Sequence, residues 1–261
     1  MESKIFLPRY DVVIKSHHKD YLKLELVIDS CIKHLKPQPK NIYLITFDGI
    51  KLKKKHESIV THIKDRDVVP HIDRKRLKHR PNWVWVNLVS ILQQNTECDL
   101  YLDVQSDNVF LQDVNVFSES GNPILFRSRA NKYNCRGHLP YFRFSKEMFD
   151  NEKTIGSDYT YISEFIMYDK RILRTLVDKH FNGSVEALIE KAISIVCDDS
   201  YPADQEIYGF LVESRFADKY DYKYPELTYT CFDKIVSKAV MKNIIKKHKH
   251  SHLAIAFHTY L

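Results

Sequence analysis

The segment from residue 10 to residue 46 places the strongest constraint on the fold, because it predicts a strand, an amphipathic helix and a second strand in close succession. Residues 10–15 and 41–46 are short apolar runs rich in β-branched and aromatic side chains, the type that forms buried parallel strands. Between them, apolar side chains recur at intervals of three and four from Leu24 to Leu35, which marks one face of a helix. Strands joined in this way pair in parallel through a right-handed crossover. The chain therefore begins as a parallel α/β sheet.

The rest of the chain continues this alternation. We expect further strands at residues 58–63 and 100–104, the second continued by residues 108–111, and an apolar run at 253–257. We expect helices from Pro81 and from Ser184 onwards, within residues 163–180, and around 205–214 and 233–248, whereas the polar section 119–141 suits loops and edge strands. No repeat or Gly/Ser linker divides residues 1–261, so we expect one α/β domain with a mostly parallel sheet flanked by helices.

Glycine is scarce, and its spacing excludes several nucleotide-binding classes. The chain has six glycines, and the closest two are Gly121 and Gly137. The GxGxxG turn and the Walker loop both need glycines much closer together, so kinases, P-loop ATPases and ordinary Rossmann dehydrogenases are excluded. HExxH and GxSxG are also absent, which removes the commonest metalloprotease and serine-hydrolase signatures.

Cysteine usage and hydropathy predict a cytoplasmic protein. The five cysteines are odd in number and widely spaced, which fits reduced thiols better than a disulfide framework or a CxxC zinc site. No apolar run is long enough to span a membrane, and the first ten residues lack the apolar core of a signal peptide.

Positive charge is concentrated in two stretches. The first begins at Lys51 and ends at Arg80, with eleven Lys or Arg against four Asp or Glu. The second runs from Lys234 to His252 and has six lysines and no acid. Both are candidates for binding a polyanion or a phosphorylated substrate, and both are equally well explained as solvated faces.

Two polar clusters follow predicted strands, where ligands bind in open parallel sheets. Ser16, His18 and Asp20 follow the first strand, and Asp103, Gln105 and Asp107 end the strand at 100–104. Residues two apart in an extended segment share a face, so we expect the side chains of this second cluster to point the same way. Such a cluster can hold a hard divalent cation against phosphate oxygens, although an Asp at a strand end also commonly caps a turn.

The order of these segments resembles the GT-A glycosyltransferases, in particular a branch known mainly as a domain of unknown function. The matching segments are residues 11–20 (DVVIKSHHKD), 83–92, 101–111 (YLDVQSDNVFL), 141–145, 161–165 and 204–209 (DQEIYG). The resemblance covers about residues 10–210. It aligns Gln105-Ser106-Asp107 with the DxD motif of the family, so that Gln105 replaces the first acid and Asp107 keeps the second.

The resemblance implies a Rossmann-like GT-A fold and transfer of a sugar from a nucleoside diphosphate sugar, a UDP-sugar first, to an acceptor hydroxyl. The acceptor would be a glycan, a protein or a modified DNA base. Residues up to about 115 would form the donor and metal half, and residues from about 116 the acceptor half.

The resemblance also implies roles for individual residues. Mn²⁺ or Mg²⁺ would be held by Asp107, with Asp103 and with His258 near the C-terminus. The nucleotide sugar would be bordered by six residues: Lys15, Ser16, His18, Asp20, Asp103 and Gln105. Glu206 and Glu164 are the candidate bases for an inverting reaction, and both are equally well explained as acids at helix N-termini.

Two other functions stay open at this point. Asp103 and Asp107 over a basic surface also suit a metal-dependent nuclease or phosphoesterase. Gln105 in place of an acid suits a non-catalytic nucleic-acid-binding protein built on a degenerate transferase scaffold.

Overall fold

The computed structural model describes residues 7–17, 20–46, 52–69, 74–129, 132–149, 159–223, 228–231 and 237–258. Its centre is a five-stranded sheet in the order β11-β5-β1-β3-β4. These strands are β1 (Tyr10–Ser16), β3 (Ile42–Thr46), β4 (Val60–Lys64), β5 (Leu100–Gln105) and β11 (Phe165–Asp169). The first four are parallel and β11 is antiparallel to β5. The predicted α/β class with a mostly parallel sheet is confirmed.

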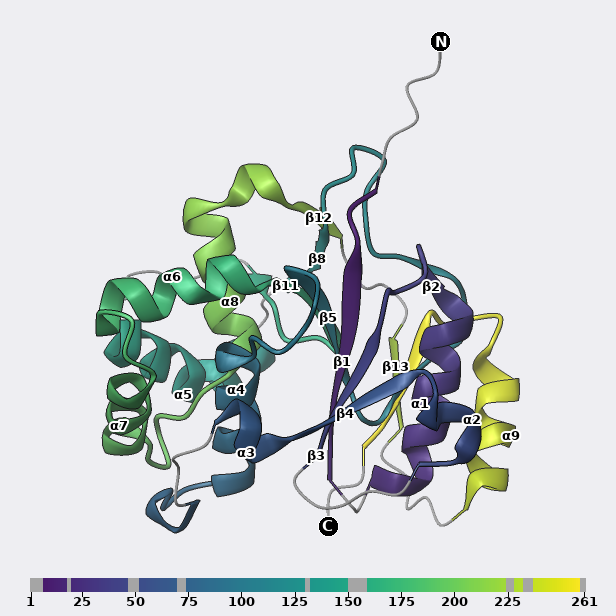
Figure 1. Ribbon diagram of the computed structural model, residues 1–261, viewed down its shortest axis with the longest axis horizontal. Helices are drawn as coiled ribbons and strands as arrows, with labels where there is room; N and C mark the ends of the chain where they lie inside the picture. The colour runs from purple at the N-terminus through teal and green to yellow at the C-terminus, as the bar shows by residue number, and fades with distance from the viewer. Residues whose placement is uncertain are drawn as a thin grey trace.

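Helices cover both faces of this sheet (Figure 1). One face carries α4 (Pro81–Leu92), α5 (Lys132–Phe149), α6 (Lys170–Phe181), α7 (Val185–Ile195) and α8 (Asp204–Arg215). The other carries α1 (Tyr21–His34), α2 (Lys54–Glu57) and α9 (Lys238–His248).

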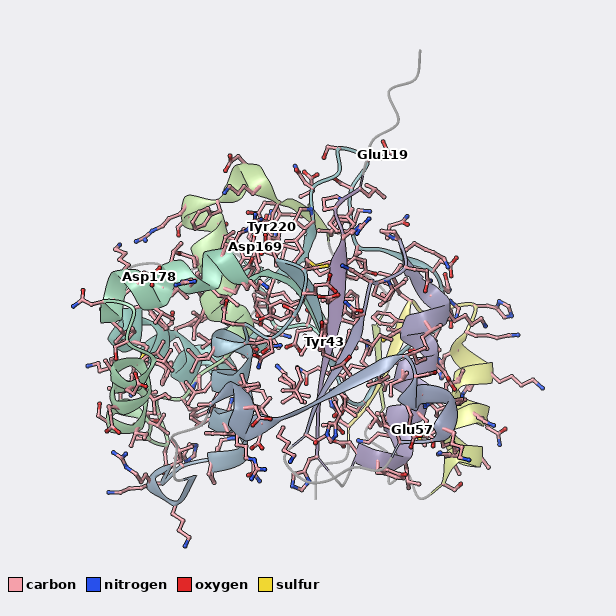
Figure 2. The ribbon with its side chains drawn as sticks, viewed as in Figure 1. Tyr43, Glu57, Glu119, Asp169, Asp178 and Tyr220 are labelled. Atoms are coloured by element: carbon pink, nitrogen blue, oxygen red, sulfur yellow. The ribbon has the colours of Figure 1, made fainter. Side chains whose placement is uncertain are left out.

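Each face of the sheet has its own apolar core, because neighbouring strand residues point to opposite faces. Val13, Tyr43 and Ile45 join the core under α4 to α8, whereas Val12 and Leu44 join the core under α1. Figure 2 shows Tyr43 in the middle of the molecule and the exposed acids Glu57, Glu119 and Asp178 at its periphery. The apolar run of β1 is thus buried on both sides, as expected of a parallel strand.

A second, three-stranded sheet brings the end of the described chain back to its first half. β14 (Ala254–Phe257) lies between β13 (Thr228–Cys231) and β6 (Asn108–Phe110), and it is antiparallel to β6. The backbone N–H of Phe257 donates to the carbonyl oxygen of Asp107 at 2.9 Å. This pairing places His258 beside the turn that follows β5.

The remaining elements are short. They are β2 (Leu35–Lys36), α3 (Asp65–Val68), η2 (Arg74–Arg76), β7 (Val114–Asn115), β8 (Ile124–Phe126), β9 (Ser128–Arg129), β10 (Tyr159–Thr160), η3 (Ala217–Lys219) and β12 (Asp221–Lys223). Within the described residues, no helix is both long and apolar enough to cross a membrane. Cys31, Cys98 and Cys197 are free thiols.

Two segments differ from the sequence-based expectation. Part of the section expected to form loops and edge strands belongs to α5, whose side chains Phe144, Met148 and Phe149 are buried against α7 and α8. Residues 165–169, for which no strand was expected, form the edge strand β11 directly before α6, the helix expected within residues 163–180. In both cases burial against distant elements outweighs the local composition.

The first basic stretch does not form one surface. α2 lies beside α1, whereas α3 and η2 lie on the other side of the sheet near α4 (Figure 1). Lys53, Lys55 and Arg76 are also paired with acids of α1 and α7. The second stretch supplies α9, where Lys238 is paired with Glu25.

Candidate functional site

A cavity of about 670 Å³ opens at the carboxyl ends of β1 and β5. These strands are adjacent, and Lys15 is in register with Gln105, so the segments that follow both strands meet at one edge of the sheet. Lys15, Asp20, Gln105 and Asp107 all line the cavity. Asp20 of the first polar cluster and Gln105 and Asp107 of the second thus lie at the same edge of the sheet, together with Lys15.

Asp107, Glu164 and His258 form an acidic group around an imidazole at one end of this cavity. Nδ1 of His258 lies 3.1 Å from Oδ2 of Asp107, and Nε2 lies 3.2 Å from Oε1 of Glu164. One potential ligand atom from each residue lies within 4.8 Å of the other two. The three residues come from the turn after β5, the segment before β11 and the end of β14, so only the tertiary fold assembles them.

The charge of His258 follows from its two neighbours. Burial lowers the pKa of the imidazole, but hydrogen bonds to Asp107 and Glu164 and their negative charges outweigh burial and raise this pKa to about 10. At neutral pH an imidazolium therefore compensates the two carboxylates. A divalent cation can supply the same compensation once His258 is neutral, since metal ligands bind in their deprotonated form.

The donor atoms of this group fit a divalent metal. Carboxylate oxygens suit Mg²⁺ and Mn²⁺, and an imidazole nitrogen is a common ligand of transition metals. Within the described residues, no other group of three or more such side chains lies close enough together to share an ion.

Lys23 and Asp20 brace the turn that carries Asp107. The Lys23 ammonium is 2.8 Å from Oδ1 of Asp20 and 4.0 Å from Oδ2 of Asp107, and it donates to the carbonyl of Phe257. The other Asp20 oxygen accepts from the Ser106 hydroxyl at 2.9 Å. Asp20 is the residue before α1, but its side chain makes no capping bond to that helix. It links the start of α1 to the turn after β5 instead.

Glu164 is positioned by the first turn of α8. The side-chain oxygen of Gln205 accepts from the backbone N–H of Ser163 at 2.7 Å, and its amide donates to the Ser163 carbonyl at 2.8 Å. The Glu164 carbonyl accepts from the N–H of Gln105 at 3.0 Å. These paired bonds hold the segment before β11 against both α8 and β5.

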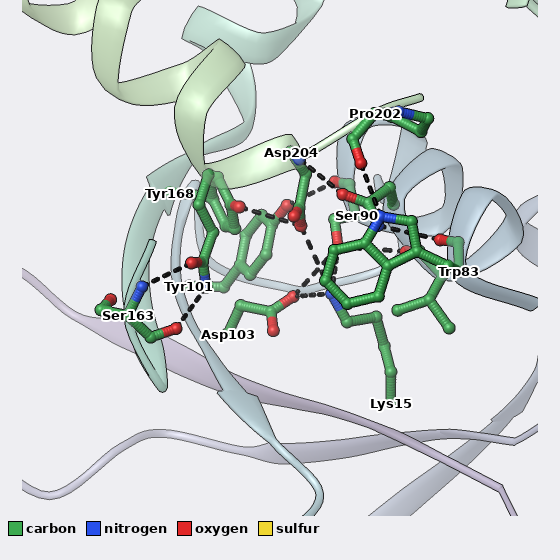
Figure 3. Close-up of polar contacts among 12 residues, drawn as sticks. Lys15, Trp83, Ser90, Tyr101, Asp103, Ser163, Tyr168, Pro202 and Asp204 are labelled. Carbon is green, nitrogen blue, oxygen red and sulfur yellow. Dashed lines mark hydrogen bonds and ion pairs between the residues drawn. The ribbon is translucent and has the colours of Figure 1, made fainter. Parts of the chain in front are cut away.

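The floor of the cavity contains a buried charge cluster (Figure 3). The Lys15 ammonium lies 2.8 Å from Oδ2 of Asp103 and 3.5 Å from Oδ2 of Asp204, and it also donates to the Ser90 hydroxyl. Asp204 accepts a further hydrogen bond from the Tyr168 hydroxyl at 3.0 Å. Lys15 and Asp204 line the cavity, whereas Asp103 lies beneath them.

In this cluster two carboxylates share one ammonium, and the pKa values of Lys15 and Asp103 reflect this imbalance of charge. Burial lowers the pKa of Lys15, but the two carboxylates outweigh it, so the ammonium stays charged. Burial raises the pKa of Asp103 to about 6, a rise that Lys15 opposes and the charge of Asp204 reinforces. Oδ1 of Asp103 is buried without a hydrogen-bond partner in the described part of the chain, which favours its protonated form.

Aromatic side chains form the wall opposite the sheet. The Trp83 indole N–H donates to the Pro202 carbonyl at 2.7 Å, and its ring stacks on Tyr141 with centroids 6.2 Å apart. Arg80, directly before α4, has its guanidinium 4.9 Å from the ring centroids of both Trp83 and Tyr201. His138 of α5 completes this wall.

Two residues predicted to act at the site do not line the cavity, and a third lies outside the described residues. Ser16 is buried and does not line the cavity. Asp103 does not share a face with Asp107, because the chain turns at Ser106 and the two-residue period of the strand ends there. His18 lies outside the described residues.

Glu206 is buried behind the wall of the cavity. Its carboxylate accepts from the Thr160 hydroxyl at 2.5 Å and from the Tyr161 N–H at 3.1 Å, and it lies 3.3 Å from Nδ1 of His138. The predicted role as a base acting directly on an acceptor is not supported by this placement, since the carboxylate is fully enclosed. Glu164, the other candidate base, belongs to the acidic group.

Sequence reasoning missed several residues of the site. They are Arg80, Trp83, His138, Tyr141, Asp204 and Gln205 as lining residues, and Lys23 as a brace. Trp83, Tyr141 and Asp204 each open a segment that matches the GT-A resemblance, and Gln205 follows Asp204, so that resemblance was the available signal for these four residues. Without it the aromatic residues carry no signal, because an aromatic side chain in a helix is more often part of a core.

Two solved glycosyltransferase structures are similar to this chain. The chain matches the bifunctional glycosyltransferase WbbM with a TM-score of 0.50 and 12% identity, over 99% of this chain and 47% of that one. It matches the galactosyltransferase LgtC, solved with donor and acceptor sugar analogs, with a TM-score of 0.47 and 12% identity, over 95% and 87% of the two chains. The chain thus spans about half the length of WbbM. No family model and no curated protein matches the sequence. The α/β fold with a mostly parallel sheet thus resembles that of WbbM.

Proposed function

We propose that the chain is a metal-dependent glycosyltransferase that uses a nucleoside diphosphate sugar. The observation that carries this proposal is the group of Asp107, Glu164 and His258 at the carboxyl edge of a GT-A-type sheet, beside a cavity large enough for a nucleotide sugar. We further propose that residues 1–261 act as one catalytic domain, because this group draws on both sides of the expected division near residue 115.

In this proposal Asp107, Glu164 and His258 hold Mn²⁺ or Mg²⁺. A cation bound by these residues would supply positive charge that stabilises the diphosphate leaving group. Lys23 keeps the Asp107 turn in place, and Gln205 keeps Glu164 in place. Gln105, at the end of β5, presents an amide that can hydrogen-bond to hydroxyl groups of the donor.

The polar floor of the cavity would hold the transferred sugar. Asp204 and Gln205 both line the cavity at the first turn of α8, and both can bond to sugar hydroxyls. The backbone N–H of Asp204 donates to the Asn87 side chain at 2.6 Å, which fixes this turn against α4. The acceptor would approach over the aromatic wall, where ring faces can contact the apolar face of a saccharide.

The proposal is tested with purified protein, Mn²⁺ and a panel of nucleotide sugars beginning with UDP-sugars. We expect slow hydrolysis of one donor in the absence of an acceptor, and its loss in Asp107→Asn. Asp113→Asn is the matched control, because Asp113 is an exposed carboxylate three residues beyond β6, paired only on the surface with His34 and Lys36.

Two results would contradict the proposal. The first is no donor hydrolysis and no change in melting temperature with any nucleotide plus Mn²⁺. The second is Mn²⁺-dependent nicking of plasmid DNA that is lost in Asp107→Asn, since that result would assign the same acidic group to a nuclease.

A further inference from the structure

Arg80 brings positive charge to the cavity on the side away from the candidate metal ligands. It directly precedes α4, which packs in the core on one face of the sheet, whereas β14, which precedes His258, packs in the core on the other face. The cavity nevertheless includes both Arg80 and His258 in its lining. A substrate that fills it would therefore meet an acidic end and a cationic end.

Aromatic rings hold the guanidinium of Arg80 in place. Its centre lies 4.9 Å from the ring centroid of Trp83 and 4.9 Å from that of Tyr201. Trp83 is itself fixed by its hydrogen bond to Pro202. A guanidinium that contacts rings through its faces keeps its N–H groups available at its edges, where they can bind a carboxylate or phosphate with two parallel hydrogen bonds.

The charge of Arg80 is not compensated within the described protein. Arg80 makes no ion pair with any carboxylate that the structure describes. Lys15, the other Lys or Arg among the described lining residues, is neutralised by Asp103 and Asp204. An anion entering the cavity at this wall would thus find an ordered cation without having to displace an acid.

The backbone of Arg80 is consistent with a functional constraint. Its φ of 42° and ψ of 51° lie in the left-handed region, which is rare for residues other than glycine, asparagine and aspartate. Residues held in such conformations cluster at ligand-binding sites.

We propose that Arg80, held by the rings of Trp83 and Tyr201, binds the anionic group of an acidic saccharide acceptor, a sugar that carries a carboxylate or a phosphate. This inference rests on the proposed glycosyl transfer and names the class of its acceptor. The guanidinium would bind the anionic substituent, and the sugar would lie in the cavity beside this wall.

Direct binding tests the site without any turnover. The only tryptophans of the chain are Trp83, in the cavity wall, and Trp85, which is buried and bonded to Asp65, so a change in emission on binding reports mainly on Trp83. Glucuronic acid, glucose 6-phosphate and methyl glucoside serve as carboxylate, phosphate and neutral probes. We expect one or both acidic probes to bind about tenfold more tightly than methyl glucoside, as a charge-assisted bidentate contact implies.

Arg80→Asn removes the guanidinium while keeping a residue that tolerates the left-handed backbone. We expect the ratio of acidic to neutral affinity to fall close to one in this variant, and to stay as in the wild type in Arg174→Gln, a change at an exposed arginine of α6. Comparison of glucuronic acid with glucose 6-phosphate shows whether the site prefers a carboxylate or a phosphate. When a donor is found by hydrolysis, the same ratio should appear in transfer rates to the two kinds of acceptor.

Equal affinity of the wild type for acidic and neutral probes would overturn the inference, and so would an acidic preference that survives in Arg80→Asn. Binding of a short DNA duplex that is lost in Arg80→Asn, without any preference among the saccharides, would also overturn it. A protein that hydrolyses no nucleotide sugar but keeps the Arg80-dependent preference would instead contradict the proposed reaction and leave the anion site standing.

Discussion

Lys15 carries the positive charge of the buried cluster at the floor of the cavity. Its side chain is almost fully enclosed, and it shares that space with the carboxylates of Asp103 and Asp204. A buried charge is tolerated only when it is paired, because moving it out of water costs far more than an exposed ion pair returns. Lys15 therefore compensates the negative charge of the cluster at neutral pH.

Lys15→Met should lower the free energy of unfolding by about 3–5 kcal/mol at pH 8, the range for a buried ion pair that loses one partner. The loss should be smaller at pH 5. The pKa of Asp103 is raised to about 6, so its contribution to stability is present in full at pH values below 3.8 and is lost as the pH rises through 6. Without Lys15 this loss becomes larger, because the ammonium no longer opposes the rise in the pKa of Asp103. Urea unfolding at both pH values measures the difference.

Lys242→Met is the control for Lys15→Met, because Lys242 is exposed on α9. It should change stability little at either pH. An equal loss for Lys15→Met at pH 5 and pH 8 would show that lost packing, and not charge, causes the effect.

At the scale of elements, α8 is the helix that organises the site. Its residues from Asp204 to Val212 are all buried, and its first turn supplies Asp204, Gln205 and Glu206 to three different contacts. Gly209 allows this helix to approach the segment after β10 closely. A Cβ atom at position 209 would lie 2.0 Å from Cγ of Tyr161, a ring that is itself fully buried.

Gly209→Ala should therefore destabilise the protein by about 1–3 kcal/mol through overpacking, although alanine favours an isolated helix over glycine by about 1 kcal/mol. Thermal unfolding followed by circular dichroism measures this change. Ser214→Ala is the control, because Ser214 is exposed at the end of the same helix. Its substitution changes helix propensity without changing core packing. A gain in stability for Gly209→Ala would mean that α8 and Tyr161 are not in contact as described.

At the scale of the whole molecule, the candidate metal site joins segments that are far apart in the chain. Asp107, Glu164 and His258 belong to the turn after β5, the segment before β11 and the end of β14. The backbone bonds between Gln105 and Glu164, and between Phe257 and Asp107, already link these segments. A bound cation would add a second link among all three.

Mn²⁺ should accordingly slow amide hydrogen exchange in the peptides that contain residues 105–108, 163–165 and 255–258 together, because a ligand that binds only the folded arrangement stabilises it. The helix α7 should exchange as before. EDTA should reverse the protection, and Asp107→Asn should prevent it in all three peptides. Protection confined to one of the three would argue against a shared ion.

The order of the elements and the edge of the sheet that carries the site could be predicted from local patterns. The apolar run of β1, the helical period from Leu24 to Leu35 and the second apolar run of β3 describe a strand–helix–strand unit without reference to the rest of the chain. Topology then brings the carboxyl ends of neighbouring parallel strands together. The proximity of Lys15, Asp20, Gln105 and Asp107 follows from that rule.

The partners of each side chain were decided only by packing between distant segments. Asp103 and Asp107 are close in sequence, yet a turn at Ser106 sends one into the protein and the other to the cavity. Glu206 is enclosed because α8 is buried from Asp204 to Val212, and Trp83 reaches the cavity because the carbonyl of Pro202 holds its ring. Local sequence determined which elements form, since their periods depend on neighbours a few residues away. Which charged side chains pair with each other depended on the tertiary structure, because electrostatic and steric contacts act through space between residues that the sequence separates.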